Sequence, residues 1–203
     1  MNISGQNLAC ERGGRLVFTG LNFAARAGRM LVLRGPNGAG KTSLLRLIAG
    51  LSEPASGILS ASGQGLSAGT TLAENVHFIA HQDAIKLHLT VFENLDFWSQ
   101  FHGHGDVPGA LHAMNLDALK DFQAQRLSAG QKRRLGLARL ALLHKPVWLL
   151  DEPTVGLDTA SQGLLARMMT KHLEADGIII ASTHIDLPVA SADILDFARL
   201  ENA

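Results

Sequence analysis

Several residue types are scarce or missing in this chain of 203 residues, and each absence narrows the possible functions. There is no tyrosine and a single cysteine, Cys10, so no internal disulfide can form, which fits a reducing compartment. Neither sign of charge dominates, because 18 Lys and Arg balance 18 Asp and Glu, so no overall field attracts nucleic acid or anionic lipid. The start, MNISGQNLACERGG, lacks the apolar segment of a signal peptide, and no uncharged apolar run could cross a bilayer. Any membrane role would therefore need a separate subunit.

The segment with the clearest chemistry is GPNGAGKTS, from Gly35 to Ser43. It follows an apolar run at 30–33 and precedes apolar residues at helical spacing, which is the strand–loop–helix context of a phosphate-binding loop. Gly35, Gly38 and Gly40 allow successive backbone N–H groups to point into one hollow at the positive end of the helix. The sequence predicts a nucleotide site here.

Two side chains of this loop have expected roles. Lys41 can reach the β- and γ-phosphates of a nucleotide, and the Thr42 hydroxyl can ligate Mg²⁺. The alternative is a glycine-rich turn that binds nothing, and the complete G-x-x-x-x-G-K-T spacing in its proper context disfavours it.

Strand and helix signals alternate along the chain. Strands are predicted at 16–18, 21–25, 30–33, 58–61, 76–80, 147–150, 178–182 and 194–200, and a helix at 159–175. Turns are expected at Gly13-Gly14 and from Ser52 to Gly57. Residues 83–145 have a helical pattern without a convincing strand. This order predicts one domain with a largely parallel sheet, helices on both faces and a helical insertion.

Two acids follow the apolar strand at 147–150. Asp151 suits Mg²⁺ or its bound water, and Glu152 is then placed to polarise an attacking water, a role worth about 10²–10⁴-fold in rate. Paired acids at a strand end can also be a solvated loop, and only the phosphate-binding loop earlier in the chain favours the catalytic interpretation.

The segment Leu127-Ser128-Ala129-Gly130-Gln131 opens another predicted helix. Ser128 suits its N-cap, and the buried face is expected to carry Leu135, Ala138, Ala141 and Leu142. Lys132, Arg133 and Arg134 lie in the first turns, where the helix dipole disfavours cations. A nearby anion would resolve this conflict, although a solvated basic face is the simpler interpretation for any one of the three.

With these segments in order, the chain resembles the ATP-binding cassette (ABC) ATPases over essentially its whole length. Gly35–Ser43 resembles Walker A, Gln82 the Q-loop and Val147–Glu152 Walker B. Leu127–Gln131 resembles the LSGGQ signature, with Ala129 in place of the first glycine. Leu157-Asp158 resembles the D-loop and His184 the H-loop.

The resemblance implies an α/β fold with a P-loop NTPase (RecA-like) core, a mostly parallel sheet, an N-terminal antiparallel β subdomain and an inserted helical subdomain. In these terms the single domain, 1–203, divides into a core at 1–82 and 146–203 and a helical subdomain at 83–145. It also implies that two copies pack head to tail over two ATP molecules, with Ser128 and Gly130 of one copy on the γ-phosphate held by Lys41 of the other.

The implied site residues fall into three groups. The catalytic residues are Glu152, His184, Lys41 and Gln82. ATP is bound by Gly35, Pro36, Asn37, Gly38, Ala39, Gly40, Lys41, Thr42, Ser43, Ser128, Gly130, Gln131 and Asp158. Mg²⁺ is held by Thr42, Gln82 and Asp151.

Other histidines have simpler interpretations. His102 and His104 could ligate a metal or haem, but an exposed glycine loop is favoured, and His77 and His81 are interpreted as structural. The aromatic that usually stacks on adenine in this family is replaced by Arg12, which leaves guanidinium stacking or weak base selectivity as alternatives.

The helical insertion offers a clue to what ATP drives. Thr90–Glu93 reads as a capping box opening a helix that carries Phe92, Phe97, Trp98 and Phe101. Most of these rings are expected to form a small core of the insertion, and a few to line a groove for a partner helix.

The chain further resembles the ATP-binding subunits of the cytochrome c maturation haem exporters. The matching stretches are Cys10-Glu11-Arg12, Gly40-Lys41-Thr42 with Leu44–Leu47, His81-Gln82, Ile85-Lys86, Leu89-Thr90, Glu93–Leu95, the Ala-bearing signature and Ala138–Leu140. This resemblance implies an ATPase on the cytoplasmic face of the inner membrane, bound to an integral membrane subunit, with no nucleic-acid partner. The alternatives are an exporter for another solute, a soluble ATPase acting on nucleic acid or ribosomes, and a non-enzymatic nucleotide-gated module.

Overall fold

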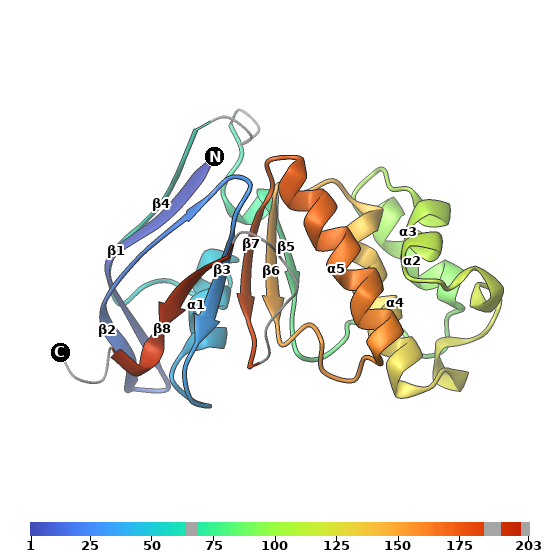
Figure 1. Ribbon diagram of the computed structural model, residues 1–203, viewed down its shortest axis with the longest axis horizontal. Coiled ribbons are helices and arrows are strands. Elements are labelled where there is room, and N and C mark those ends of the chain that lie inside the picture. The colour runs from blue at the N-terminus through green and yellow to red at the C-terminus, as the bar shows by residue number, and fades with distance from the viewer. Residues whose placement is uncertain (64–68, 185–191, 200–203) are drawn as a thin grey trace.

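The computed structural model describes residues 1–63, 69–184 and 192–199, which form two sheets and the helices around them. A three-stranded antiparallel sheet in the order β2-β1-β4 lies at one end of the molecule (Figure 1). A five-stranded sheet in the order β5-β6-β7-β3-β8 lies at its centre, and all of its pairs are parallel. The predicted α/β fold with a parallel core sheet and an antiparallel N-terminal sheet is confirmed.

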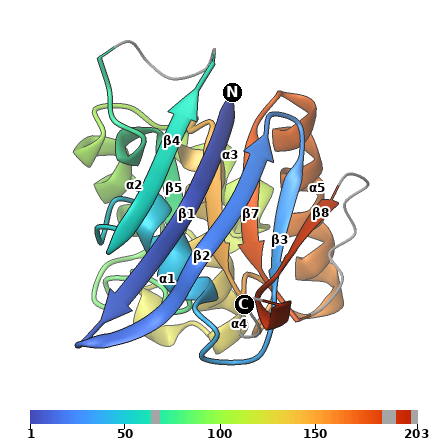
Figure 2. The same ribbon diagram turned by 90° about the vertical axis from the view of Figure 1, so that its left-hand side faces the viewer.

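The antiparallel sheet, which faces the viewer in Figure 2, consists of β1 (Asn2–Arg12), β2 (Arg15–Arg26) and β4 (Ser56–Ser62). β2 is one strand where the sequence predicts two short ones, at 16–18 and 21–25. Gly13 and Gly14 turn between β1 and β2 with φ of 59° and 74°. Alternate residues of β2 are buried, as its pattern predicts. Gly57 is not in the predicted loop but within β4, because Ser56 already pairs with Ala9 of β1.

The parallel sheet consists of β3 (Met30–Arg34), β5 (Val76–Ile79), β6 (Val147–Asp151), β7 (Ile178–Ser182) and β8 (Ala192–Asp196). The prediction for the last strand, 194–200, is wrong at both ends. β8 begins at Ala192 and ends at Asp196, where the Asp196 carboxylate accepts a hydrogen bond from the Ala198 N–H and a 3₁₀ turn, Phe197–Arg199, follows. The turn buries the Phe197 ring edge-on against Phe18 of β2. Leu200 lies outside the described residues.

Helices cover both faces of the parallel sheet. α1 (Lys41–Ile48) lies between the two sheets, and α4 (Ala129–Leu142) and α5 (Thr159–Glu174) lie on the other face (Figure 1). α2 (Val91–Phe101) and α3 (Val107–Ala113) form a further layer outside α4. Short 3₁₀ turns occupy Ala73–Asn75, Asp117–Leu119 and Ala124–Arg126. The sheet thus divides two hydrophobic cores, and alternate residues of its strands pack into one or the other.

The helical layer corrects one prediction. Thr90 and Glu93 form the expected capping box at the start of α2. However, Trp98 alone of the four rings of α2 packs against the buried cluster, whereas Phe92, Phe97 and Phe101 are 40%, 39% and 70% exposed. Most of the rings are therefore not a core. The division of the chain into a core and a helical subdomain at 83–145 stays a prediction.

Candidate functional site

The glycine-rich loop between β3 and α1 has the curled backbone that its sequence predicts. Gly35, Gly38 and Gly40 have φ of 142°, 85° and 105°, values that other residues rarely adopt. A Cβ on Gly40 would lie 2.8 Å from the Phe18 ring, so this position also needs glycine for packing. A Cβ on Gly38 would meet nothing within 4 Å, because this residue borders open space.

Lys41 lies inside this loop rather than in solvent. It is 7% exposed, and its ammonium donates to the carbonyls of Gly35 at 2.7 Å and Pro36 at 2.9 Å. These bonds hold the charge against the hollow formed by the loop. A buried cation there, beside the helix N-terminus, favours a polyphosphate.

Thr42 and Asp151 are 109 residues apart in sequence and are hydrogen-bonded in the structure. The Thr42 hydroxyl donates to Asp151 Oδ2 at 2.8 Å, and the Ser182 hydroxyl donates to Asp151 Oδ1 at 2.5 Å. Asp151 is 5% exposed, at the carboxyl end of β6. A hydroxyl beside a carboxylate is an oxygen donor set that fits Mg²⁺, which takes one or two protein groups and completes its shell with phosphates and water. Among the described residues no group of three His, Cys, Asp or Glu could hold a metal alone.

Glu152 and His184 meet at the same sheet edge. His184 Nε2 lies 3.3 Å from Glu152 Oε1 and 3.1 Å from Asn37 Oδ1, so this nitrogen faces two oxygens that can accept a hydrogen bond from it. Glu152 has φ of 47°, an uncommon value for a residue other than glycine. Its N–H donates to the carbonyl and the hydroxyl of Ser182. The backbone is thus held in a conformation that directs the carboxylate toward the loop.

These groups border one cavity of about 760 Å³. It is lined by Arg12, Arg15, Val17, Asn37, Gly38, Gly40, Lys41, Thr42, Ser43, His81, Asp151, Glu152, Val155 and His184. No aromatic ring of Phe or Trp is among the described residues that line it, and Arg12 is there, as its register predicts. The arrangement offers cations and backbone N–H groups for phosphates, and a carboxylate that can polarise water.

His81 and Gln82 are neighbours in the chain, and of the two only His81 lines this cavity. His81, which was interpreted as structural, is exposed and lines it, whereas Gln82 is exposed and does not. The predicted role of Gln82 toward Mg²⁺ and water stays a prediction.

The signature segment lies outside this cavity. Ser128 is the N-cap of α4, accepting from the Gln131 N–H at 3.2 Å, and the Gln131 side chain accepts from the Ser128 N–H at 2.8 Å. Asp158 caps α5 through the Ser161 N–H at 2.8 Å, and these bonds to Ser161 hold the pKa of the Asp158 carboxyl below its usual range. Ser128 is exposed, so its hydroxyl remains accessible to a second molecule.

For Arg133, the nearby anion, which was the less favoured of the two interpretations left open by the sequence, is correct. A solvated basic face was the simpler interpretation, but Arg133 is 5% exposed. Its Nη1 lies 2.8 Å from Asp83 Oδ1, and Nη2 donates to the Glu152 carbonyl at 2.9 Å. Asp83 is therefore the nearby anion that offsets the unfavourable position of this cation close to the N-terminus of α4. The predicted buried face of α4 is otherwise confirmed, with Ala141 only half-buried.

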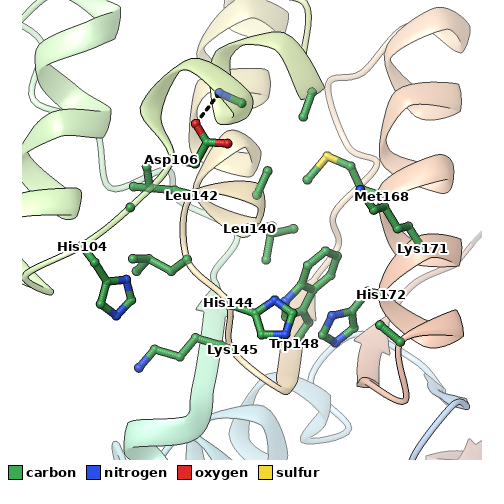
Figure 3. Close-up of a pocket in the computed structure, with 16 residues that line it drawn as sticks. His104, Asp106, Leu140, Leu142, His144, Lys145, Trp148, Met168, Lys171 and His172 are labelled. Carbon is green, nitrogen blue, oxygen red and sulfur yellow. Dashed lines mark hydrogen bonds between the residues drawn. The ribbon is translucent and has the colours of Figure 1, made fainter.

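The remaining histidines lie away from this cavity. His77 is buried, and the desolvation of its ring, with Arg139 nearby, lowers its pKa to about 3, which agrees with a structural role. His104 is exposed and borders a separate pocket of about 550 Å³ near the amino end of β6, where Trp148 stacks on His172 at 3.9 Å (Figure 3). His102 stacks on Trp98. Neither His102 nor His104 belongs to a metal-ligating group of the described residues.

The fold and the loop geometry define a class of protein. Residues 18–155 match the family model described as "ABC transporter", so the chain belongs to the ABC transporter family of ATP-binding proteins. A solved protein described as an ATP-binding subunit of an ABC transporter superposes with a TM-score of 0.83 at 25% identity, covering 97% of this chain and 87% of that one. A Pyrococcus furiosus protein, 21% identical over 96% of this chain and 98% of that one, has the same fold with a TM-score of 0.79.

Proteins similar in sequence identify the chain's family within this class. The chain is 48% identical to the cytochrome c biogenesis ATP-binding export protein CcmA of Rhodopseudomonas palustris (strain BisB5), over 96% of this chain and 97% of the relative. It is 50% identical, with the same coverage, to CcmA of Nitrobacter winogradskyi. The chain therefore belongs to the CcmA family. In the part of the chain that the structure describes, no helix is both long and apolar enough to span a membrane.

Proposed function

We propose that this chain is the ATP-hydrolysing, energy-coupling subunit of an ABC exporter that serves c-type cytochrome biogenesis. The observation that carries the proposal is the convergence of Lys41, Thr42, Asp151, Glu152 and His184 on one cavity of a chain of this family. The names of the relatives at about 48% identity supply the biological process.

The residues of the chain divide the chemistry between them. The N–H groups of the loop and the Lys41 ammonium bind the β- and γ-phosphates of ATP. Glu152 accepts a proton of the attacking water as the water oxygen adds to the γ-phosphorus, while the bond from that phosphorus to the β–γ bridging oxygen breaks and ADP leaves. His184 orients Glu152 through the 3.3 Å contact. Thr42 and Asp151, which are hydrogen-bonded to each other at the cavity, would hold Mg²⁺, and this ion when bound neutralises charge on the phosphates. Gln82, which does not line the cavity in this structure, is proposed to join them when the site closes over nucleotide. The Ser182 hydroxyl keeps the Asp151 carboxylate in place.

The active form is a head-to-tail dimer. The exposed Ser128 hydroxyl and the adjacent Gly130 lie outside the cavity of their own chain, and a second copy would bring them onto the γ-phosphate. In this arrangement each site is composed of the loop of one chain and the signature of the other. ATP binding therefore favours closure, and hydrolysis favours opening.

The membrane partner is proposed to bind the helical layer. Phe92, Phe97 and Phe101 project from α2 with 40%, 39% and 70% of their surface exposed. Phe122 is distant in sequence but lies beside the start of α2, where its carbonyl accepts a hydrogen bond from the Val91 N–H, and it is 51% exposed. Exposed rings on one element are typical of protein–protein contact. An integral membrane subunit seated there would hold the chain at the cytoplasmic face of the inner membrane, as a peripheral subunit of a haem or haem-chaperone exporter.

Co-purification combined with a deletion strain tests this function. A tagged chain purified from detergent extracts is expected to carry an integral membrane subunit and to hydrolyse ATP. A strain without the gene is expected to lose holo c-type cytochromes, with recovery by the wild-type gene and not by Glu152→Gln. Normal cytochromes in the deletion strain would contradict the assigned process, and a soluble partner on ribosomes or nucleic acid would contradict the exporter.

A further inference from the structure

Arg133 joins three segments that are distant in sequence. It lies on α4, five positions after the N-cap Ser128, and its side chain is buried. Nη1 donates to the Ala80 carbonyl at 3.2 Å and to Asp83 Oδ1 at 2.8 Å, and so reaches the residues on both sides of Gln82. Nη2 donates to the carbonyls of Asp151 at 3.4 Å and Glu152 at 2.9 Å. One planar guanidinium thus spans the ends of β5 and β6.

The contact at Glu152 fixes an unusual backbone conformation. Glu152 has φ of 47°, a left-handed conformation that a residue other than glycine keeps only where its surroundings hold it. Its N–H donates to Ser182, and its carbonyl accepts from Arg133 Nη2 at 2.9 Å and, in the local turn, from the Val155 N–H at 3.3 Å. Both polar backbone groups of the proposed general base are therefore held from neighbouring elements, one of them by the signature helix.

The surface of α4 leaves room for the ion pair between Arg133 and Asp83. Gly136 lies three positions after Arg133, and a Cβ there would collide with the Asp83 carboxylate. Asp83 is thus enclosed between the guanidinium and a helix position with no side chain. Burial raises the pKa of the Asp83 carboxyl, and the hydrogen bond from Arg133 opposes that shift. The ion pair is built into the packing of the helix rather than lying on its surface.

We propose that Arg133 is a positioning residue that ties Glu152 and the Gln82 segment to the signature helix of the same chain. Movement of Ser128, when it meets the nucleotide of a second copy, is transmitted through about one and a half helical turns to the Glu152 backbone. Contact between Ser128 and the nucleotide at one site then positions Glu152, the general base of the other site. This inference rests on the proposed ATPase dimer.

The experiment measures steady-state ATP hydrolysis and binding of a fluorescent ATP analogue for the 203-residue chain and its variants. Arg133→Gln is expected to lower kcat by about 10²-fold, the effect of displacing a catalytic group by about 1 Å, with analogue affinity changed less than about threefold. The Hill coefficient for ATP is expected to fall from above 1 to 1. Arg133→Lys should recover only part of kcat, because a single nitrogen cannot span both segments.

Two further variants separate positioning from folding. Arg134→Gln is the matched control on the same helix, since among the described residues Arg134 donates to the carbonyls of Met114 and Asn115 and to no group of Glu152 or of residues 80–83. Its kcat is expected to stay within about threefold of wild type. Arg133→Gln with Asp83→Asn leaves no unpaired buried charge, so it should melt close to wild type yet keep the low kcat.

The outcomes distinguish this inference from the proposed function. If the wild-type chain does not hydrolyse ATP, the proposed function fails. If wild type hydrolyses ATP with a Hill coefficient of 1, or if Arg133→Gln or the folded double variant matches Arg134→Gln, the positioning role is overturned while the ATPase assignment stands. A fall in analogue affinity that equals the fall in kcat would also overturn it.

Discussion

At the scale of single residues, the account depends on Glu152. Its carboxylate lies 3.3 Å from His184 and its backbone is held at φ of 47°, so the side chain has one defined direction. Glu152→Gln keeps the shape and removes the proton acceptor. We expect kcat for ATP to fall by about 10²–10⁴-fold, with ATP binding retained.

A phosphate-release assay measures this turnover, and equilibrium dialysis of ATP measures the binding. Glu174→Gln, at the exposed end of α5, is the matched control and should hydrolyse ATP like wild type. Undiminished hydrolysis by Glu152→Gln would exclude Glu152 as the base.

His77 gives a prediction about pH. Burial lowers its pKa to about 3 in the folded chain, against an ordinary value of 6.5. Below pH 6.5 the unfolded chain therefore binds a proton that the folded chain does not, and the free energy of unfolding falls as pH falls from about 6.5 toward 3. At pH 5 this loss is about 2 kcal/mol.

Urea unfolding at pH 7.5 and pH 5 measures the effect. His77→Leu should lose about 2 kcal/mol less than wild type between these pH values, and His88→Leu, at an exposed position, should lose as much as wild type. Equal losses in wild type and His77→Leu would show that His77 is protonated in the folded chain.

At the scale of elements, the capping box of α2 stabilises the layer proposed to meet the membrane partner. The Thr90 hydroxyl accepts from the Glu93 N–H at 3.1 Å, and the Glu93 carboxylate accepts from the Thr90 N–H at 2.7 Å. Thr90→Ala should lower the free energy of unfolding by about 1 kcal/mol without changing ATP affinity.

Chemical denaturation checks this value, with Thr170→Ala on the exposed side of α5 as the control. A change of ATP affinity in Thr90→Ala would mean that α2 influences the nucleotide cavity, although no residue of α2 lines it.

Elements also show what the sequence could and could not predict. The strand–loop–helix around Lys41 and the strand before Asp151 were predictable, because apolar runs, glycines and acids are local patterns. Arg133 was not, since its partner Asp83 lies 50 residues earlier and comes close only when α4 packs beside β5. The exposed rings of α2 were also misjudged, because helical spacing does not tell a buried aromatic face from one left for a partner.

At the scale of the whole molecule, the composite site predicts the effect of a change far from the cavity. Ser128 is exposed and lines none of the cavity of its own chain. Ser128→Arg should therefore leave binding of ATP to one chain intact and abolish turnover, because the larger cation obstructs the second copy. Wild-type hydrolysis by this variant would argue against a site shared between chains.

The central claim is that two copies close over ATP between the loop of one and the signature of the other. The mass in solution of the Glu152→Gln variant with ATP and Mg²⁺, measured by light scattering, tests it most directly. With ATP, the measured mass is expected to be about twice the 21.6 kDa of one chain. Without ATP, or when Ser128→Arg is added to the variant, it is expected to be that of a single chain. A strictly monomeric ATP-loaded variant, beside a wild-type chain that hydrolyses ATP at full rate, would contradict it.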